Sequence, residues 1–193
     1  GKITVGDVDV GETFTAEIVD SLGNAITNTN FEVVSTATGY NVRVLAGATL
    51  DYETTPQHQV YVKVTDSGGN SRIDLLTIDV QNVNETPINV TASLNAIAEG
   101  AAAGTVAATL SSTDVDSGES FTYQLIDAQG PAHTHATFEV VGNEIRVKSG
   151  GDVDAESGAN VLRVRTIDSA GNWFDRQIAM SITNTDEAPF EVT

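Results

Sequence analysis

The sequence predicts an all-β protein made of two similar β-sandwich domains in tandem. Val, Ile and Thr dominate the apolar-rich segments, apolar and polar residues alternate over short stretches, and the chain repeats itself at a spacing of roughly 100 residues. A length of 193 residues is sufficient for two domains of about 100 residues, each with its own core. No long helical period is present.

Short alternating segments recur in both halves of the chain. They are residues 14–19, 41–45, 60–64 and 73–80, and then residues 104–110, 121–126, 144–147, 161–167 and 173–182. Turns that contain Gly separate them, as at residues 67–70 and 169–172. Residues 96–103 are rich in Ala, but Gly100 and Gly104 favour an irregular strand over a helix. About seven short strands in 100 residues is typical of the immunoglobulin-like β-sandwich.

The internal repeat defines the domains. Five segments recur in the same order: residues 6–15 as 113–122, 31–34 as 138–141, 50–53 as 153–156, 64–70 as 166–172, and 82–87 as 184–189. We therefore predict tandem homologous domains over residues 1–87 and 88–193. Pro87 ends the hinge between them and keeps the preceding peptide extended.

The two copies differ at their starts. The second has a leading segment, residues 88–110, before its Asp-Val-Asp motif, whereas the first has only residues 1–6. The first domain is therefore expected to lack its leading strand, which leaves a sheet edge or groove unfilled. Because the chain begins abruptly at Gly1, we expect a piece of a longer protein, or a strand that is supplied from elsewhere.

The charge balance excludes several classes of function. There are 27 acidic and 9 basic residues, for a net charge of −18, so the chain lacks the basic stripe that nucleic acid binding requires. The absence of Cys excludes disulfides and thiolate metal sites. No apolar run approaches the ~20 residues of a membrane span, so direct membrane insertion is not expected. Large bacterial surface proteins often lack Cys in this way.

Acidic residues recur in pairs that are two positions apart. On an extended chain such side chains point the same way, so each pair can converge on one point. Two carboxylates ~4 Å apart repel by roughly 4 kcal/mol at an effective dielectric near 20, so a dense cluster requires cations. An all-oxygen set without Cys or His favours calcium over zinc or copper. End-to-end stacking of the domains would gather Asp51, Glu53, Asn82, Asn84, Glu85, Asp114, Asp116 and Asp168 at one junction.

Three of these motifs together resemble the signatures of cadherin repeats. They are Leu-Asp-Tyr-Glu at residues 50–53, Val-Thr-Asp-Ser-Gly-Gly at 64–69 and Asn-Val-Asn-Glu-Thr-Pro at 82–87. The closer likeness is to the cadherin-like tandem repeats of bacterial surface and secreted adhesins. The resemblance implies calcium ions between successive domains, held by the eight residues above and by the carbonyl of Val83.

The resemblance also implies two half-sites that would bind weakly or stay empty. Asp7, Asp9 and Asp66 would form one of them, and the other would use Glu99, Asp154, Glu156, Asn184, Asp186 and Glu187. The first linker position, usually Asp in relatives, is Asn82 here, and the early Glu of the first domain is missing with its leading strand. We therefore expect two calcium ions at the junction, with one or three ions as the alternatives.

Other chemistry-bearing residues are weaker candidates. His133 and His135 have the spacing of two ligands on one strand face, but a loop pair without a role is favoured. Trp173 has two alternative roles, packing at a core or sheet edge and stacking on a sugar, and packing is favoured. The same two alternatives apply to Tyr40, Tyr52 and Tyr123. No Ser/His/Asp arrangement stands out, so an enzyme is not expected.

The leading hypothesis is a calcium-binding segment of an extracellular or cell-surface adhesin, which serves adhesion or acts as a spacer. Calcium would make the interdomain junction rigid, and the partners would be neighbouring repeats and a polysaccharide or another cell-surface protein. The alternative is a calcium-dependent carbohydrate-binding module. A third hypothesis is homotypic adhesion, although a Trp anchor in a first strand is absent.

Overall fold

The computed structural model describes residues 1–6, 11–156 and 161–186, which form strands and turns and no helix. It divides into two compact units, Gly1–Val83 and Asn84–Thr193. The boundary that the repeat predicts, after Pro87, remains a prediction. None of the described residues forms a helix with the length and apolar character needed to span a membrane.

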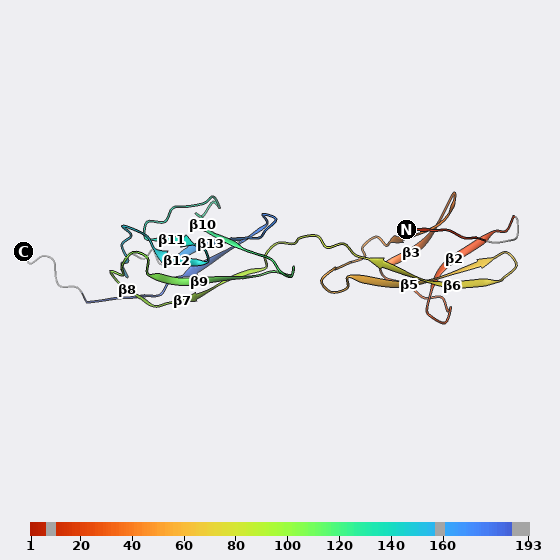
Figure 1. Cartoon of the computed structure of the whole chain (residues 1–193), viewed down its shortest axis with the longest axis horizontal. Coiled ribbons are helices and arrows are strands. Elements are labelled where there is room, and N and C mark those ends of the chain that lie inside the picture. The colour runs from red at the N-terminus through yellow and green to blue at the C-terminus, as the bar shows by residue number, and fades with distance from the viewer. Residues whose placement is uncertain (7–10, 157–160, 187–193) are drawn as a thin grey trace, which may run out of the picture. The chain divides into compact units, whose positions relative to one another are not determined.

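Unit 2 is a β-sandwich whose strands run along the length of the unit (Figure 1). One sheet has the order β11-β12-β9-β7 and the facing sheet has the order β10-β13-β14, while β8 and β15 pair in parallel. The strands are β7 (Asn89–Leu94), β8 (Ile97–Ala98), β9 (Val106–Thr113), β10 (Thr122–Leu125), β11 (Phe138–Val141), β12 (Glu144–Val147), β13 (Val161–Ile167), β14 (Trp173–Ala179) and β15 (Ile182–Thr183).

Alternation along these strands builds the core of unit 2. On β13, Leu162, Val164 and Thr166 are buried while the residues between them are more exposed, as expected for a strand with one inward face. The hydroxyl of Ser112 donates a hydrogen bond of 2.7 Å to Thr166 Oγ1, so the one buried hydroxyl on this strand is satisfied. Phe138 contributes the largest of the fully buried side chains.

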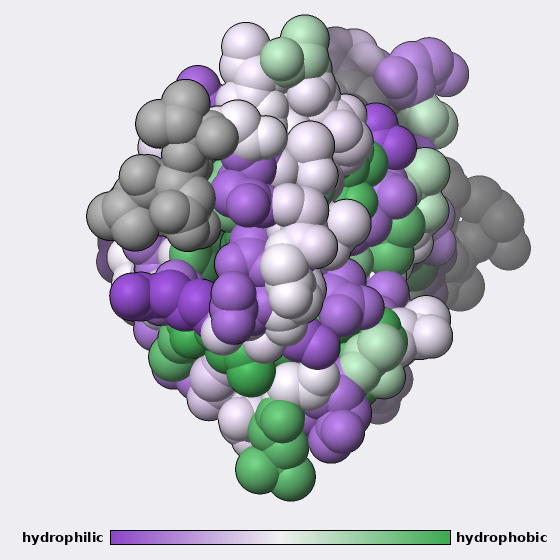
Figure 2. All heavy atoms as spheres, turned by 90° about the vertical axis from the view of Figure 1, so that its right-hand side faces the viewer, coloured by the Kyte–Doolittle hydropathy of each residue, from purple (hydrophilic) through white to green (hydrophobic). Residues whose placement is uncertain are grey.

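Unit 1 repeats most of this arrangement. One sheet has the order β1-β4-β3 and the other has the order β2-β5-β6. The strands are β1 (Lys2–Ile3), β2 (Phe14–Val19), β3 (Phe31–Thr36), β4 (Gly39–Val44), β5 (Gln57–Asp66) and β6 (Ser71–Asp79). Phe31, Val42 and Val62 lie in its smaller core. Hydrophilic side chains cover much of the end of unit 1 in Figure 2, with hydrophobic residues interspersed.

No leading strand is present among the described residues of unit 1, in line with the expectation from the sequence. β1 pairs antiparallel with β4 as β9 pairs with β12, and the described residues of unit 1 contain no counterpart of β7 or β8. In unit 2, Arg176 on β14 donates a hydrogen bond of 2.7 Å to Asn89 Oδ1 on β7. The corresponding region of unit 1, between residues 2–6 and β6, is an open pocket of about 560 Å³ that Phe14 and Leu76 help to line.

Several predicted strands differ in their bounds from the observed ones, and two of these differences have a clear structural reason. Residues 173–182 form β14 and β15, because the chain leaves β13 and pairs with β8 instead; Ile97 N donates to Ser181 O at 3.1 Å. Residues 104–110 begin with a turn at Gly104, where φ is 85°, so β9 starts only at Val106. Both differences arise from pairing and backbone conformation that alternation does not encode.

Candidate calcium-binding residues

The segment before β7 is anchored in unit 2 by Pro87, one of its most deeply buried residues. The next amide, Ile88 N, donates to Thr113 O at 3.0 Å at the end of β9. Since Pro87 keeps the preceding residues extended, Asn84 and Glu85 lie beside the loops that follow β9 and β13. Asn84 and Glu85 therefore lie at the end of the sandwich that carries the loops after β9 and β13.

The loop after β9 contributes two carboxylates. Glu85 N donates to Asp116 Oδ2 at 2.9 Å, and Asp116 is only 7% exposed. Asp116 N in turn donates to Asp114 Oδ1 at 3.2 Å, which orients the Asp114 carboxylate. Its other oxygen, Oδ2, is buried and has no hydrogen-bond partner among the described residues. A buried carboxylate oxygen is costly without a donor or a cation, so this atom fits a metal ligand.

The loop after β13 places a third carboxylate in the same neighbourhood. Asn84 Nδ2 donates to Asp168 Oδ2 at 2.8 Å, and the backbone amides of Ala170 and Asn172 donate to Oδ1 at 2.9 and 2.8 Å. Burial raises the pKa of Asp168, but hydrogen bonds from Asn84, Asn172 and Gly171 outweigh it, so the pKa lies below its usual value. Asp168 is therefore an ionised ligand candidate at neutral pH.

Unit 1 carries its own acidic turn at residues 51–55. Glu53 N donates to Asp51 Oδ1 at 3.0 Å, and Thr54 Oγ1 donates to Oδ2 at 2.7 Å. These hydrogen bonds, that of the Thr54 side chain first, lower the pKa of Asp51. Asp51 and Glu53 are both exposed, as are Asn82 and Val83 at the end of the unit.

A second carboxylate cluster lies elsewhere in unit 2. The carboxylate oxygens of Glu99, Asp154 and Glu156 lie within 4.8 Å of one another. Thr185 N donates to Glu99 Oε2 at 3.2 Å, and the side-chain amide of Asn184 donates to Glu156 Oε1. Four members of the half-site predicted from Glu99 to Glu187, namely Glu99, Asp154, Glu156 and Asn184, are thus brought together.

Only some of the remaining half-site residues lie in the described part of the chain. Asp186 is described and exposed, whereas Glu187 lies outside the described residues, as do Asp7 and Asp9. Asp66 accepts hydrogen bonds from the backbone and side-chain nitrogens of Asn70 at 2.8 and 3.0 Å, the arrangement that Asp168 has with the Asn172 backbone. Hydrogen bonding, that of the Asn70 side chain first, lowers the pKa of Asp66.

Two supporting residues were not predicted from the sequence. Asn172 Nδ2 donates to Glu85 O at 3.3 Å and so ties the segment before β7 to the β13–β14 turn. Glu119 Oε2 accepts from Ser169 Oγ at 2.7 Å beside that turn. Both residues recur in the internal repeat, as Asn70 and Glu12, and the Ser67 hydroxyl bonds to Glu12 in the same way. Their repetition is the signal that could have identified them.

Contacts within the fold account for three of the four aromatic candidates, Trp173, Tyr40 and Tyr123. The Arg165 guanidinium lies 3.7 Å from the centre of the Trp173 ring and bonds to Asp175 at 2.7 Å, a cation–π stack on the sheet surface. The hydroxyl of Tyr40 donates to Phe14 O, and Tyr123 packs against the core of unit 2. Tyr52 is 39% exposed.

Comparison with known proteins finds cadherins. The chain is 31% identical to protocadherin alpha-2 of Homo sapiens over 122 residues, which is 61% of this chain and 12% of that protein. It is 34% identical to protocadherin-10 of Homo sapiens over 125 residues, 61% of this chain and 11% of that protein. The chain therefore spans only about an eighth of these relatives. No family model matches it.

Solved structures agree on the fold. Extracellular cadherin domains 3–6 of protocadherin gamma B2 match with a TM-score of 0.61 at 19% identity, covering 90% of this chain and 42% of theirs. Domains EC1-2 of human protocadherin-24 match with a TM-score of 0.53 at 16% identity, covering 90% of this chain and 82% of theirs.

These comparisons bear on several of the predictions. The predicted extracellular or cell-surface location is confirmed by the cadherin relatives. None of the proteins named is an enzyme by its description, and none of them supports carbohydrate binding. The two protocadherins named above are human, so the expected bacterial origin stays a prediction. The predicted fold class is confirmed: the chain consists of tandem β-sandwich domains of the cadherin-like fold.

Proposed function

We propose that this chain is a calcium-binding, cadherin-like segment of an extracellular adhesion protein, in which calcium makes the junction between the two domains rigid. The bound ion supplies positive charge that offsets the repulsion between the carboxylates around it. The oxygen atoms come from Asp114, Asp116 and Asp168 of unit 2 and from Asp51 and Glu53 of unit 1, together with Asn82, the Val83 carbonyl, Asn84 and Glu85.

The carboxylates of unit 2 provide the observation on which the proposal depends. Asp116 and Asp168 are 7% and 6% exposed, and one buried oxygen of Asp114 has no donor among the residues that the structure describes. Burial of three carboxylates near one another is unfavourable unless a cation or hydrogen bonds compensate. Asn84 and the Glu85 amide satisfy Asp168 and Asp116, whereas Asp114 Oδ2 is available to an ion.

The repeat supports the contribution of unit 1. Asp51 and Glu53 correspond to Asp154 and Glu156, which form a compact cluster with Glu99 in unit 2. Unit 1 has no counterpart of β8, the strand that Glu99 follows, among its described residues. We therefore expect the junction to have one carboxylate fewer than a junction between two complete domains, and to bind two ions with correspondingly lower affinity.

Calcium binding and domain rigidity are tested by separate measurements on the same chain. Isothermal titration gives the number and affinity of the ions. Because the chain has no native Cys, Thr77→Cys and Ser93→Cys introduce the only two thiols, and a spin label is attached to each. Thr77 is an exposed position on β6, and Ser93 is an exposed position on β7. We expect a broad distance distribution with chelator and a narrow one with calcium.

Two results would contradict the proposal. An absence of calcium binding at millimolar concentration would reject the metal site. Binding that leaves the distance distribution broad would reject the rigid junction while retaining the site. Magnesium at equal concentration is the control, because it prefers a stricter octahedron and keeps more of its water.

The adhesive role follows from the relatives and remains a proposal. The chain matches about an eighth of protocadherin alpha-2, so the ligand and partners of that whole protein are not assigned to this chain. Neighbouring cadherin-like repeats are the proposed partners on either side. The bacterial adhesin origin is part of this proposal and is tested by the sequence context of the gene.

A further inference from the structure

The turn that leads into β11 is held by a histidine, in a place where the other domain uses an asparagine. His135 Nδ1 accepts hydrogen bonds from Thr137 N at 3.1 Å and Phe138 N at 3.2 Å. In unit 1, Asn28 Oδ1 accepts from Asn30 N at 2.9 Å and Phe31 N at 2.8 Å. Phe31 and Phe138 begin the repeated Phe-Glu-Val-Val segment, so the two acceptors occupy equivalent positions.

The two acceptors differ in their response to protons. A carboxamide oxygen accepts hydrogen bonds at any pH in the physiological range. Imidazole accepts at Nδ1 only as the neutral form with its proton on Nε2, because both nitrogens of imidazolium are donors. Protonation of His135 therefore removes both bonds and places an N–H against two amide N–H groups.

The surroundings of His135 hold the turn tightly and disfavour the charged form. Thr137 O accepts from Lys148 N at 2.8 Å, and Thr137 Oγ1 donates to Asp152 O at 2.9 Å. The His135 ring lies 5.6 Å from the ring of the buried Phe138. The two amide groups would each lose an acceptor, and leaving such groups unsatisfied in a packed region costs free energy.

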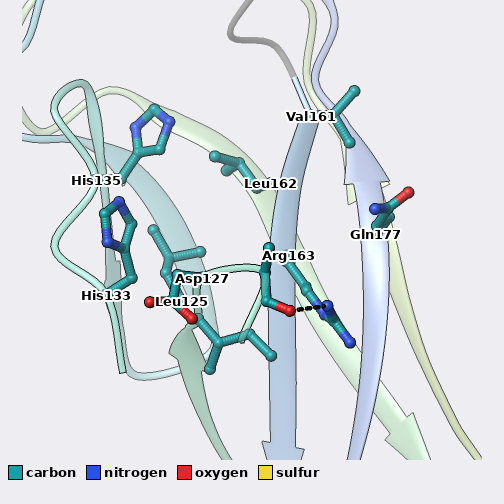
Figure 3. Close-up of a pocket in the computed structure, with 10 residues that line it drawn as sticks. Leu125, Asp127, His133, His135, Val161, Leu162, Arg163 and Gln177 are labelled. Carbon is teal, nitrogen blue, oxygen red and sulfur yellow. Dashed lines mark hydrogen bonds between the residues drawn. The ribbon is translucent and has the colours of Figure 1, made fainter. Parts of the chain in front are cut away.

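The charged and titratable neighbours of His135 come from several elements. His133 lies on the same segment, and the centre of its ring is 6.5 Å from that of His135. Lys148 follows β12, and its ammonium group donates a hydrogen bond of 3.5 Å to His135 O. Both histidines border a pocket of about 280 Å³ (Figure 3). Asp127, which follows β10, and Arg163, which lies on β13, also line this pocket. Burial first, and then the positive charges of His133 and Lys148, lower the pKa of His135.

We propose that His135 is a pH-sensitive acceptor in unit 2: its neutral ring holds the turn into β11, and its protonation in mild acid releases that turn and loosens the pocket beside β13. The folded state binds the proton less readily than the unfolded state. The stabilisation is therefore complete above the unfolded pKa of about 6.5 and is lost as the pH falls from there toward the lower folded value.

The sole tryptophan allows unit 2 to be measured within the intact chain. Trp173 lies on β14, so its fluorescence follows the unfolding of unit 2 in urea. The measurement is made with chelator at pH 7 and pH 5. Carboxylates, whose unfolded pKa values lie near 4, titrate alike in the wild type and in the variants below, so the comparison between them isolates His135. The unfolding constant is expected to rise by about three- to tenfold from pH 7 to pH 5 in the wild type.

Three variants distinguish the turn from other histidine effects. His135→Asn copies Asn28 and should keep the turn while its pH response falls to less than about twofold. His135→Ala should be less stable than His135→Asn at both pH values, with an equally small change of the unfolding constant between them. His133→Asn should show the same change of the unfolding constant as the wild type. A His135→Asn variant with the same pH response as the wild type would overturn the proposal.

A measurement on the unmodified chain is independent of variant folding. Two-bond ¹H–¹⁵N correlation spectra report which imidazole nitrogen carries the proton. We expect His135 as the Nε2–H form at pH 7, with the Thr137 and Phe138 amide signals shifting as His135 titrates. A proton on Nδ1 at pH 7, or amide signals that do not follow the titration, would contradict the inference.

Discussion

The side chain of Asn84 donates a hydrogen bond of 2.8 Å to the carboxylate of Asp168, across a sequence separation of 84 residues. This bond ties the segment before β7 to the loop after β13. Asn172 adds a second tie, from its side-chain amide to the carbonyl of Glu85. The acidic end of unit 2 is therefore partly organised by amide donors before any ion binds.

Replacing Asn84 should lower the thermal stability of unit 2 even in the absence of calcium. Asn84→Ala leaves the nearly buried Asp168 with one donor fewer, and we expect the melting temperature of unit 2 to fall by about 5 °C in chelator. Trp173 fluorescence during thermal unfolding measures it. Gln177→Ala, on the exposed face of β14, is the control and should shift the melting temperature by about 1 °C or less. Equal shifts in the two variants would show that the bond to Asp168 is not stabilising.

Removing single carboxylates should lower calcium affinity. Asp114→Asn and Asp116→Asn keep the shape of each side chain but remove a charged ligand, and we expect at least about a tenfold increase in the dissociation constant for each. Titration calorimetry gives the values. Glu139→Gln removes the same charge from an exposed position on β11 and should leave the affinity nearly unchanged. A similar loss in all three would indicate a general charge effect.

Adding a carboxylate at the first linker position should have the opposite effect. Asn82→Asp increases the ligand charge, so we expect tighter calcium binding by about three- to tenfold. Gln81→Glu adds the same charge one residue earlier at another exposed position and serves as the matched control. An affinity gain that is equal in both variants would assign the effect to long-range electrostatics and not to a ligand at position 82.

Strong acid should destabilise both domains in a range separate from that of His135. Hydrogen bonds lower the pKa values of Asp51 and Asp66 in unit 1 and of Asp168 in unit 2. The folded state therefore releases these protons more readily, and the stabilisation is present above the unfolded pKa near 3.8 and lost as the pH falls through the lower folded values. Urea unfolding at pH 6 and pH 3 in chelator should show this loss. Asp66→Asn should reduce the loss in unit 1 and leave that in unit 2 unchanged.

The two cores should respond separately to core truncation. Ile145 is fully buried in unit 2, and Ile145→Ala is expected to cost about 2–5 kcal/mol of unfolding free energy there. Val161→Ala, at a position that is 56% exposed, should cost far less. Trp173 fluorescence reports unit 2, and amide NMR signals of Val42 and Val62 report unit 1. Loss of the unit 1 signals together with unit 2 would contradict two independent cores.

Most of the strands and the repeat were predictable from the sequence. Alternation predicts the observed bounds of β2, β12 and β13, because each of these strands has one face on a core and the other toward solvent. The end of β14 was not predictable, because the chain changes its partner from β13 to β8 there and no residue pattern records a partner.

The sequence by itself determined the fold class, the tandem order and the residue types of the candidate calcium site, since strand periodicity and oxygen ligands are local properties of the chain. Only the tertiary structure decided which side chains meet. It joined Asn84 to Asp168 and placed His135 where the first domain has Asn28. It also left Asp114 Oδ2 without a donor within the described part of the chain. These relationships depend on strand pairing and burial, which bring together residues that are distant in the sequence and set the cost of each unsatisfied polar atom.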